Sequence, residues 1–507
     1  MQAETIPKRL LRQKKKMSQI LIIFFAFFVQ FADKSGSEHI ALSEYAIEKR
    51  IERGIAIDSL DYAVSPIYID SLLTIGCHIH HTSRWMNGAT IEADSITIQK
   101  IRQWSFVDSI YLTRMERYEI DNTAATHHDG EEDDFGFSSQ SLRKKAVEYV
   151  EIRHSSLLSE GTYSTQAQIE QLNLHLLHQL DFQGQGVIMA VIDGGFQHAD
   201  TLSAFDKVRA QILGTYDMTD DEDSMFGATS NHGTKCFGTI AAMTDDYHGA
   251  AVAAYYYLIR SEEHYTESPK EMDNWVAAIE LADSLGVDIV SSSLGYSLFD
   301  DEVFALGYAM LDGQTTRCAQ AAQIAADKGM LVVIAAGNEG DKTWHHISTP
   351  GDADDILTVG AVDINDSIAS FSSWGPSADG RVKPEVCAMG YQTALIHPID
   401  NSSIYGNGTS FACPIIAGMA ACLWSAIPYA NNKEIRERII QSANRYAYPH
   451  EQYGYGIPDA WVAYTRATDI EEIKEEHTPK AKKVLINGNL WILYNGKRYN
   501  VMGYKHE

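Results

Sequence analysis

Apolar residues in the middle of the chain fall into short runs separated by longer stretches with helical spacing. Four runs rich in Val, Ile and Leu, each bounded by Gly or Asp, fit strands: 187–192, 287–292, 330–335 and 356–362. Three intervening stretches fit helices: 236–242, 275–285 and 318–328. Strands that alternate with helices predict a mostly parallel sheet with helices on both faces. We therefore expect an α/β domain over residues 161–465.

A smaller unit precedes this domain, at residues 33–120. Two stretches in it fit helices, 65–73 and 97–104. Three stretches with alternating or β-branched residues fit strands: 77–82, 90–93 and 107–113. The order helix, strand, strand, helix, strand predicts a small α+β domain with its helices on one face of an antiparallel sheet.

The N-terminus has the pattern of an export signal. Basic residues at positions 8–16 precede an apolar stretch at 20–32, followed by polar sequence. That stretch is shorter than the roughly 18 apolar residues that a membrane-spanning helix needs. We therefore expect a signal peptide at residues 1–32 and no membrane span in the mature protein. An uncleaved anchor is the alternative.

Two further segments differ in character from both domains. Residues 121–160 are acidic and then Ser-rich, which predicts an exposed linker. Residues 466–507 contain Asn-Gly dipeptides at 487–488 and 495–496 between apolar runs, which predicts a three-stranded β-meander. This last segment loosely resembles the short C-terminal tails of some bacterial secreted proteins.

The charge and cysteine content exclude some classes of protein. A formal net charge of -27 argues against nucleic acid as a partner, because phosphates require Lys and Arg. The 6 cysteines are scattered without a close pair, so a disulfide scaffold is not expected. Small buried apolar residues are the better interpretation, with one or two bridges as the alternative.

Three short segments each contribute one candidate catalytic residue. Asp193 ends the first apolar run and is followed by two glycines, so its carboxylate is expected at the edge of the sheet. His232 precedes Gly233 and opens a helix. Ser410 opens an apolar helix, with Pro414 expected in its first turn, where a missing N–H is tolerated. The dipole of that helix favours negative charge developing at Ser410.

These residues make chemical sense as a set. A serine hydroxyl needs an adjacent base, and the base needs an orienting carboxylate. Each residue alone fits an ordinary turn or helix cap. Asn338 follows another predicted strand at the same sheet edge, and its carboxamide can donate to the oxyanion of a tetrahedral intermediate. The co-occurrence of all four favours nucleophilic catalysis.

Residues 160–465 resemble the subtilisin-like serine proteases. The motifs that carry this resemblance are Val-Ile-Asp-Gly-Gly at 191–195, Asn-His-Gly-Thr at 231–234, Ala-Ala-Gly-Asn-Glu-Gly at 335–340, Phe-Ser-Ser-Trp-Gly-Pro at 371–376 and Gly-Asn-Gly-Thr-Ser-Phe-Ala at 406–412. The resemblance implies that Asp193 orients the imidazole and that His232 is the general base and then the acid. It also implies that Ser410 is the nucleophile and that Asn338 serves the oxyanion hole.

The same resemblance suggests where a substrate binds. It implies that the backbone of Ser293, Leu294 and Gly295 pairs with an extended peptide. It also implies that this segment and a second one, Ala335, Ala336 and Gly337, line the main side-chain pocket. The sequence departs from the family at Cys236, where an apolar residue is common, and at Met389, where the family often has Pro. Neither departure touches the candidate triad.

The N-terminal unit resembles a subtilisin-type propeptide, which implies a folding template and an intramolecular inhibitor. Two features in and after it could suggest metals. The segment Cys-His-Ile-His-His at 77–81 shows no carboxylate at ligand spacing, so no metal is expected there. The acidic insertion at 217–223 could hold a structural calcium ion, but a charged surface loop fits its spacing better. No other cofactor is expected.

The sequence thus predicts an exported bacterial serine endopeptidase, made as a zymogen, that hydrolyses protein or peptide substrates through an acyl-enzyme on Ser410. It would be secreted, periplasmic or attached to the cell surface. The alternative is a catalytically silent relative that binds peptides or partners in the same groove. A nucleotide-binding α/β protein is the remaining alternative, and no Gly-rich phosphate motif supports it.

Overall fold

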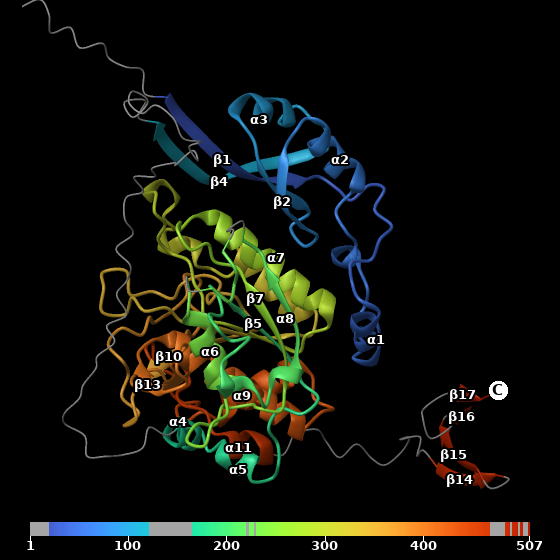
Figure 1. The fold of residues 1–507 in the computed structure, drawn as a ribbon, viewed down its shortest axis with the longest axis vertical. Helices are drawn as coiled ribbons and strands as arrows, with labels where there is room; N and C mark the ends of the chain where they lie inside the picture. The colour runs from blue at the N-terminus through green and yellow to red at the C-terminus, as the bar shows by residue number, and fades with distance from the viewer. Residues whose placement is uncertain are drawn as a thin grey trace, which may run out of the picture. The chain divides into compact units, whose positions relative to one another are not determined.

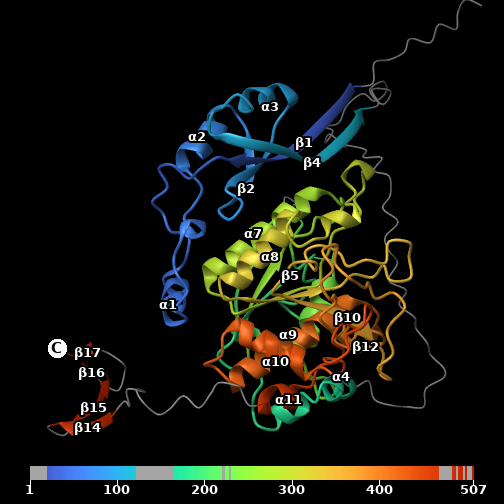
Figure 2. The same ribbon diagram turned by 180° about the vertical axis from the view of Figure 1, so that it is seen from behind.

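The computed structural model describes residues 20–120, 165–219, 223–227 and 230–466, together with short strands between 482 and 506. The chain divides into two compact units, Met1–Tyr464 and Thr465–Glu507. Figures 1 and 2 show the first unit from opposite sides. The predicted linker at 121–160 lies outside the described residues.

A parallel sheet forms the centre of the first unit, as predicted. Its seven strands lie in the order β11-β10-β9-β8-β5-β7-β6, and every neighbouring pair is parallel. The strands are β5 (Ile188–Asp193), β6 (Ile212–Asp217), β7 (Tyr255–Arg260), β8 (Ile289–Ser292), β9 (Leu331–Ala335), β10 (Leu357–Val362) and β11 (Val386–Met389). The sequence pattern predicted four of these strands. A separate hairpin consists of β12 (Thr393–Ile396) and β13 (Ser403–Gly406).

Helices cover both faces of this sheet (Figures 1 and 2). One face packs against α6 (His232–Ala241) and α9 (Thr409–Ala426), and the other against α7 (Pro269–Leu285) and α8 (Arg317–Asp327). Four further helices extend the layer of α6 and α9: α4 (Gln166–Gln171), α5 (His175–His178), α10 (Asn432–Ser442) and α11 (Ala460–Thr465). The sheet is therefore buried on both sides, which explains its near-continuous apolar strands.

Alternation along β5 decides where its last residue points. Met189 and Val191 belong to the core beneath α6 and α9, whereas Ile188 and Ile192 belong to the core beneath α7 and α8. Successive side chains of a strand point to opposite faces. Asp193 therefore continues the row of Met189 and Val191, on the face from which α6 and α9 begin.

The N-terminal part of the first unit is a second, antiparallel sheet. Its strands are β1 (Ile20–Phe31), β2 (His78–Ser83), β3 (Gly88–Glu92) and β4 (Val107–Ile120), in the order β2-β3-β1-β4. Its helices are α1 (Glu44–Glu52), α2 (Pro66–Thr74) and α3 (Ser95–Ile101). The two helices and three strands predicted for this unit are confirmed.

The prediction made for the apolar stretch at 20–32 is corrected by the structure. The sequence pattern predicts a signal peptide at 1–32, but in the structure β1 is a central strand that pairs with both β3 and β4. Phe28 packs into the core of α7, and Val29 and Phe31 pack into the core of the small domain. A strand covered on both faces is continuously apolar, as is the core of a signal peptide. The small domain therefore begins before residue 33.

The C-terminal unit contains the predicted meander and one additional strand. Its strands β14 (Lys482–Ile486), β15 (Asn489–Tyr494), β16 (Lys497–Tyr499) and β17 (Lys505–His506) pair antiparallel in chain order. The two Asn-Gly dipeptides lie outside the described residues.

Two sequence expectations about burial can be compared with the structure. All six cysteines are buried and carry free thiols, as expected for small apolar residues. Within the described ranges, α9 is the one helix long and apolar enough to cross a membrane, but 89% of it is buried inside the unit. It is therefore a core helix of the first unit.

Candidate active site

Asp193 and His232 form a hydrogen-bonded pair at the carboxyl edge of the sheet. Asp193 is fully buried at the end of β5, and His232 is the first residue of α6. Asp193 Oδ1 lies 2.7 Å from His232 Nδ1 and 2.7 Å from the amide nitrogen of Gly194, which donates to it. An imidazole that donates from Nδ1 carries its lone pair on Nε2, so Nε2 is the nitrogen that accepts a proton.

Glycines allow α6 to begin this close to β5. A Cβ atom on Gly233 would lie 2.5 Å from the carbonyl oxygen of Gly195 and 2.9 Å from the Cβ of Asp193. Gly195 itself has a φ of 138°, which side chains rarely tolerate. The Gly-Gly and His-Gly sequences are therefore required by the approach of the histidine to the aspartate.

Ser410 is the second residue of α9 and is 5% exposed. Pro414 is the sixth residue of the helix, so the expectation that it lies in the first turn is wrong. Because proline has no N–H, the carbonyl of Ser410 loses its helical partner. The Ser293 hydroxyl donates to that carbonyl at 2.7 Å, and Ser410 Oγ donates to the Ser293 carbonyl at 3.3 Å. The proline thus lets β8 hold the start of α9.

Cys236 links the histidine to the serine. One helical turn after His232, its Sγ lies 3.7 Å from His232 Nδ1 and 3.4 Å from the Ser410 carbonyl oxygen. Burial and the nearby Asp193 carboxylate raise the pKa of this thiol, so it stays protonated. The sequence analysis noted Cys236 only as a departure. Its spacing of four residues from His232 was the available signal.

Asn338 lies beside the N-terminus of α9, the helix that carries Ser410. Its Oδ1 accepts from the backbone amide of Thr409 at 2.9 Å and from the Thr409 hydroxyl at 3.0 Å. These bonds fix the carboxamide with its oxygen toward α9, so that its NH2 group is the remaining donor. Asn338 follows Gly337, whose φ of 106° turns the chain at the end of β9.

The six predicted substrate-binding residues lie at the ends of the adjacent strands β8 and β9: Ala335 is the last residue of β9, and the other five follow the two strands. Of the first segment, Ser293 is buried, Leu294 is half-buried and Gly295 is exposed. Of the second, Ala335 and Ala336 are buried and Gly337 is half-buried. Backbone pairing already uses Ala336, whose amide donates to Val359 and whose carbonyl accepts from Ser348. Leu294, Gly295 and Gly337 are therefore the more accessible members.

The acidic insertion before α6 is partly described. Asp217 Oδ1 accepts from the amide and hydroxyl of Thr219, and Asp217 Oδ2 lies 3.4 Å from Arg260 Nη1. Residues 220–222 lie outside the described ranges. The Asp217 carboxylate is thus engaged in a turn and an ion pair, as a surface loop would be. The calcium alternative gains no support from it.

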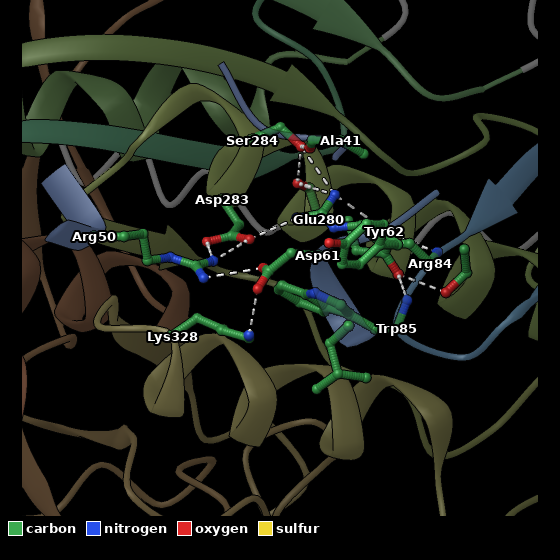
Figure 3. Close-up of polar contacts among 12 residues, drawn as sticks. Ala41, Arg50, Asp61, Tyr62, Arg84, Trp85, Glu280, Asp283, Ser284 and Lys328 are labelled. Carbon is green, nitrogen blue, oxygen red and sulfur yellow. Dashed lines mark hydrogen bonds and ion pairs between the residues drawn. The ribbon is translucent and has the colours of Figure 1, made fainter. Parts of the chain in front are cut away.

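The small domain packs on α7 through buried ion pairs (Figure 3). Asp283 on α7 accepts from Arg50 at 2.6 Å and from Arg84 at 2.6 Å. Arg50 also contacts Asp61 at 3.0 Å, and Asp61 contacts Lys328, directly after α8, at 2.8 Å. The charges of the two partners are therefore interleaved.

Glu280, one turn before Asp283, makes a second anchor. It accepts from the backbone amide of Arg84 at 2.9 Å and from the Ser83 hydroxyl. Burial raises the pKa of Glu280, although the Arg84 guanidinium and these hydrogen bonds oppose that rise. Nearly all of its stabilising contacts thus come from the loop that joins β2 and β3.

The fold and this site define a class: α/β proteins with an Asp–His pair at the sheet edge and a serine at the N-terminus of a neighbouring helix, here joined through Cys236. The chain belongs to the subtilase family, whose model matches residues 184–456. A second model, the peptidase S8 propeptide domain of Bacteroidota, matches residues 26–128. The small domain is therefore a propeptide domain, and β1 enters that match.

Curated relatives agree with this assignment. The chain is similar to the thermophilic serine proteinase of Bacillus sp. (strain AK1), with 31% identity over 284 residues, 55% of this chain and 62% of the relative. It is 28% identical to the serine protease AprX of Bacillus subtilis (strain 168) over 52% of this chain and 62% of that protein. It is 29% identical to subtilisin E of the same strain over 63% and 75%. The chain thus spans less than two thirds of the length of the first two.

Proposed function

We propose that the protein is a serine endopeptidase that cleaves peptide bonds through an acyl-enzyme on Ser410. The observation that carries the proposal is the 2.7 Å contact between buried Asp193 and His232, on the sheet face where the helix of Ser410 begins. Membership of the subtilase family supports it. Protein or peptide substrates follow from this activity.

The proposed reaction uses each residue in turn. His232 Nε2 removes the proton of Ser410 Oγ as the oxygen attacks the scissile carbonyl. The Asn338 NH2 group donates to the resulting oxyanion. The protonated His232, stabilised by Asp193, then gives its proton to the leaving amine, and the acyl group stays on Ser410. A water molecule that loses a proton to His232 releases the acid and restores the serine.

We further propose that the propeptide domain makes the protein a zymogen. Its sheet and the buried ion pairs with α7 and α8 support this. A parallel sheet of distant segments folds slowly, so a preformed domain that binds α7 gives folding a template. The uncut chain would be inactive until the propeptide leaves.

Action outside the cytoplasm of a bacterium is part of the proposal. Its support is the Bacteroidota propeptide and the similarity to subtilisins. Fractionation of cells that express the full chain should place it in the periplasm, at the surface or in the medium. Recovery from the cytoplasm alone would contradict this.

Labelling with a fluorophosphonate probe tests the catalytic proposal. The processed wild-type protein should be labelled at Ser410 and should hydrolyse casein, whereas Ser410→Ala should show neither. The exposed Ser402 offers a matched control, and Ser402→Ala should label like the wild type. Labelling that persists in Ser410→Ala would contradict the assignment. A processed wild type without labelling or hydrolysis would favour the catalytically silent alternative.

A further inference from the structure

Two histidines and one glutamate gather on the propeptide sheet, away from the triad. His78 lies opposite Glu92 in the pairing of β2 with β3. The register of these strands shifts between Ile79 and His81, so His80 occupies a bulge. A bulge redirects a side chain, and the ring of His80 lies 4.7 Å from that of His78. The sequence analysis found no carboxylate for these histidines, because Glu92 comes from the neighbouring strand.

The spacing of these groups fits a metal ion. His80 Nε2 lies 3.4 Å from Glu92 Oε1, and one ligand atom of each of the three residues lies within 4.8 Å of the others. Ligands at about 2.0–2.2 Å from a tetrahedral zinc ion lie about 3.3 Å from one another. The His80–Glu92 pair therefore already has this separation. His78 is exposed, so its ring can turn toward the pair at little cost.

The chemistry of the three side chains narrows the choice of ion. Two of the three side chains are imidazoles and the third is a carboxylate. Two imidazoles and one carboxylate suit Zn²⁺ and related transition metal ions, whereas Ca²⁺ and Mg²⁺ prefer oxygen ligands alone. The nearby Lys270 bonds Glu263 through its Nζ at 2.6 Å.

We propose that His78, His80 and Glu92, brought together by the bulge between β2 and β3, bind Zn²⁺ or a similar transition metal ion in the propeptide. Water would complete the coordination. The His80 side chain is 2% exposed and Glu92 is 40% exposed, so the ion would enter from the side of His78 and Glu92.

The same two strands contact the catalytic domain. His81 Nε2 lies 2.7 Å from the carbonyl oxygen of Met218, and the Thr90 hydroxyl donates to Asp273 of α7 at 3.0 Å. An ion that joins β2 to β3 would therefore hold the surface that docks on α7. This consequence rests on the proposed zymogen: the ion would stabilise the uncut chain and leave with the propeptide.

Metal binding is best measured on the full chain with Ser410→Ala, which cannot process itself. Titration with Co²⁺ should give the visible absorption of a tetrahedral site, and Zn²⁺ should abolish it. Adding His78→Ala or Glu92→Gln should remove one bound ion or lower the affinity for it. The loss of affinity should exceed the 10–100-fold that follows when a residue hydrogen-bonded to a ligand is lost. His39→Ala, an exposed histidine of the same domain, should bind like the parent.

Thermal unfolding keeps the test independent of both folding failure and hydrolysis. Zn²⁺ should raise the Tm of the Ser410→Ala chain and of its His39→Ala variant, but not that of the nearly isosteric Glu92→Gln variant. Equal numbers of bound ions in the parent, His78→Ala and Glu92→Gln would overturn the proposal. Because every chain carries Ser410→Ala, a failure of the protease proposal would leave this result unaffected.

Discussion

Asn338 is oriented by Thr409, the residue beside the proposed nucleophile Ser410. Thr409 supplies both an amide and a hydroxyl to Asn338 Oδ1, at 2.9 and 3.0 Å. The carboxamide is thus fixed before any substrate arrives, so its NH2 group does not have to reorganise during the reaction. Preorganised donors of this kind stabilise a transition state more than they stabilise bound substrate.

Asn338→Ala should lower kcat by about 100- to 1,000-fold and leave KM nearly unchanged, a magnitude measured in subtilisin, which is itself a member of this family. Steady-state kinetics on a peptide substrate would measure both constants. Asn365→Ala, at an exposed position after β10, provides the control. A rise in KM with unchanged kcat would assign Asn338 to substrate binding instead.

His178 illustrates how burial sets a pH limit. Desolvation lowers its pKa to about 4 from 6.5, although its contact with the Ala250 carbonyl oxygen at 2.9 Å opposes the shift. Between these two values the unfolded chain binds a proton that the folded chain does not. The contribution of His178 to stability is therefore present above about pH 6.5 and is lost as the pH falls toward 4.

Urea unfolding of the Ser410→Ala chain at a series of pH values should reveal this loss, which for the half-buried His178 should be at most about 3 kcal/mol. His178→Gln should flatten the slope between pH 6.5 and 4, since glutamine does not titrate. His39→Gln, at an exposed position, should keep the slope of the parent. Identical slopes in all three chains would show that His178 is not the source.

At the scale of elements, the sequence predicted the strands and helices that carry the candidate triad. Val187–Ile192 became β5 with a shift of one residue, because apolar periodicity records which side chains are buried. The same signal failed for β1. This strand packs against α7 on one face and against the core of the small domain on the other, so it has no polar side. Its sequence is therefore as continuously apolar as that of a signal peptide. Glu92 could not be paired with His80 because strand register depends on a bulge that no local pattern marks.

Gly233 tests whether the start of α6 must lie against β5. Gly233→Ala would place a Cβ 2.5 Å from the Gly195 carbonyl oxygen, which should displace His232 from Asp193 and lower kcat by at least about 100-fold, in the range of lost general acid–base catalysis. Gly238→Ala in the same helix meets Ile396 at 3.5 Å, an ordinary contact, and should retain activity. Equal activity of the two variants would contradict this account.

At the scale of the whole molecule, the propeptide and the catalytic domain share one set of buried charges. Removing one member of a buried pair leaves an uncompensated ion and typically costs about 3–5 kcal/mol, whereas an exposed pair contributes about 0–1 kcal/mol. The Asp283 side chain is 4% exposed and meets two arginines of the propeptide. Docking of the propeptide should therefore depend strongly on this residue.

Asp283→Asn should destabilise the uncut Ser410→Ala chain by about 3 kcal/mol or more, measured by urea unfolding. In the active chain it should shorten the lag before casein hydrolysis, because the propeptide would dissociate sooner. Asp327→Asn breaks an exposed pair with Lys433 and serves as the control, with a change below about 1 kcal/mol. An unchanged lag in Asp283→Asn would show that other contacts govern release.

The ion pairs around Asp283 and Glu280 also limit how the sequences of the two domains can change in evolution. Arg50 and Arg84 match carboxylates on a helix more than 190 positions further along the chain. A propeptide taken from a relative that lacks these arginines would bury the two carboxylates without a cationic partner. It would therefore be a poor inhibitor, even if its fold were the same. A mutation of one of these arginines is therefore expected to be tolerated only with a compensating mutation of the carboxylate that it contacts, and the reverse. The contacting residues of the two domains should therefore change together in evolution. Each protein of this kind should bind its own propeptide more tightly than the propeptides of related proteins.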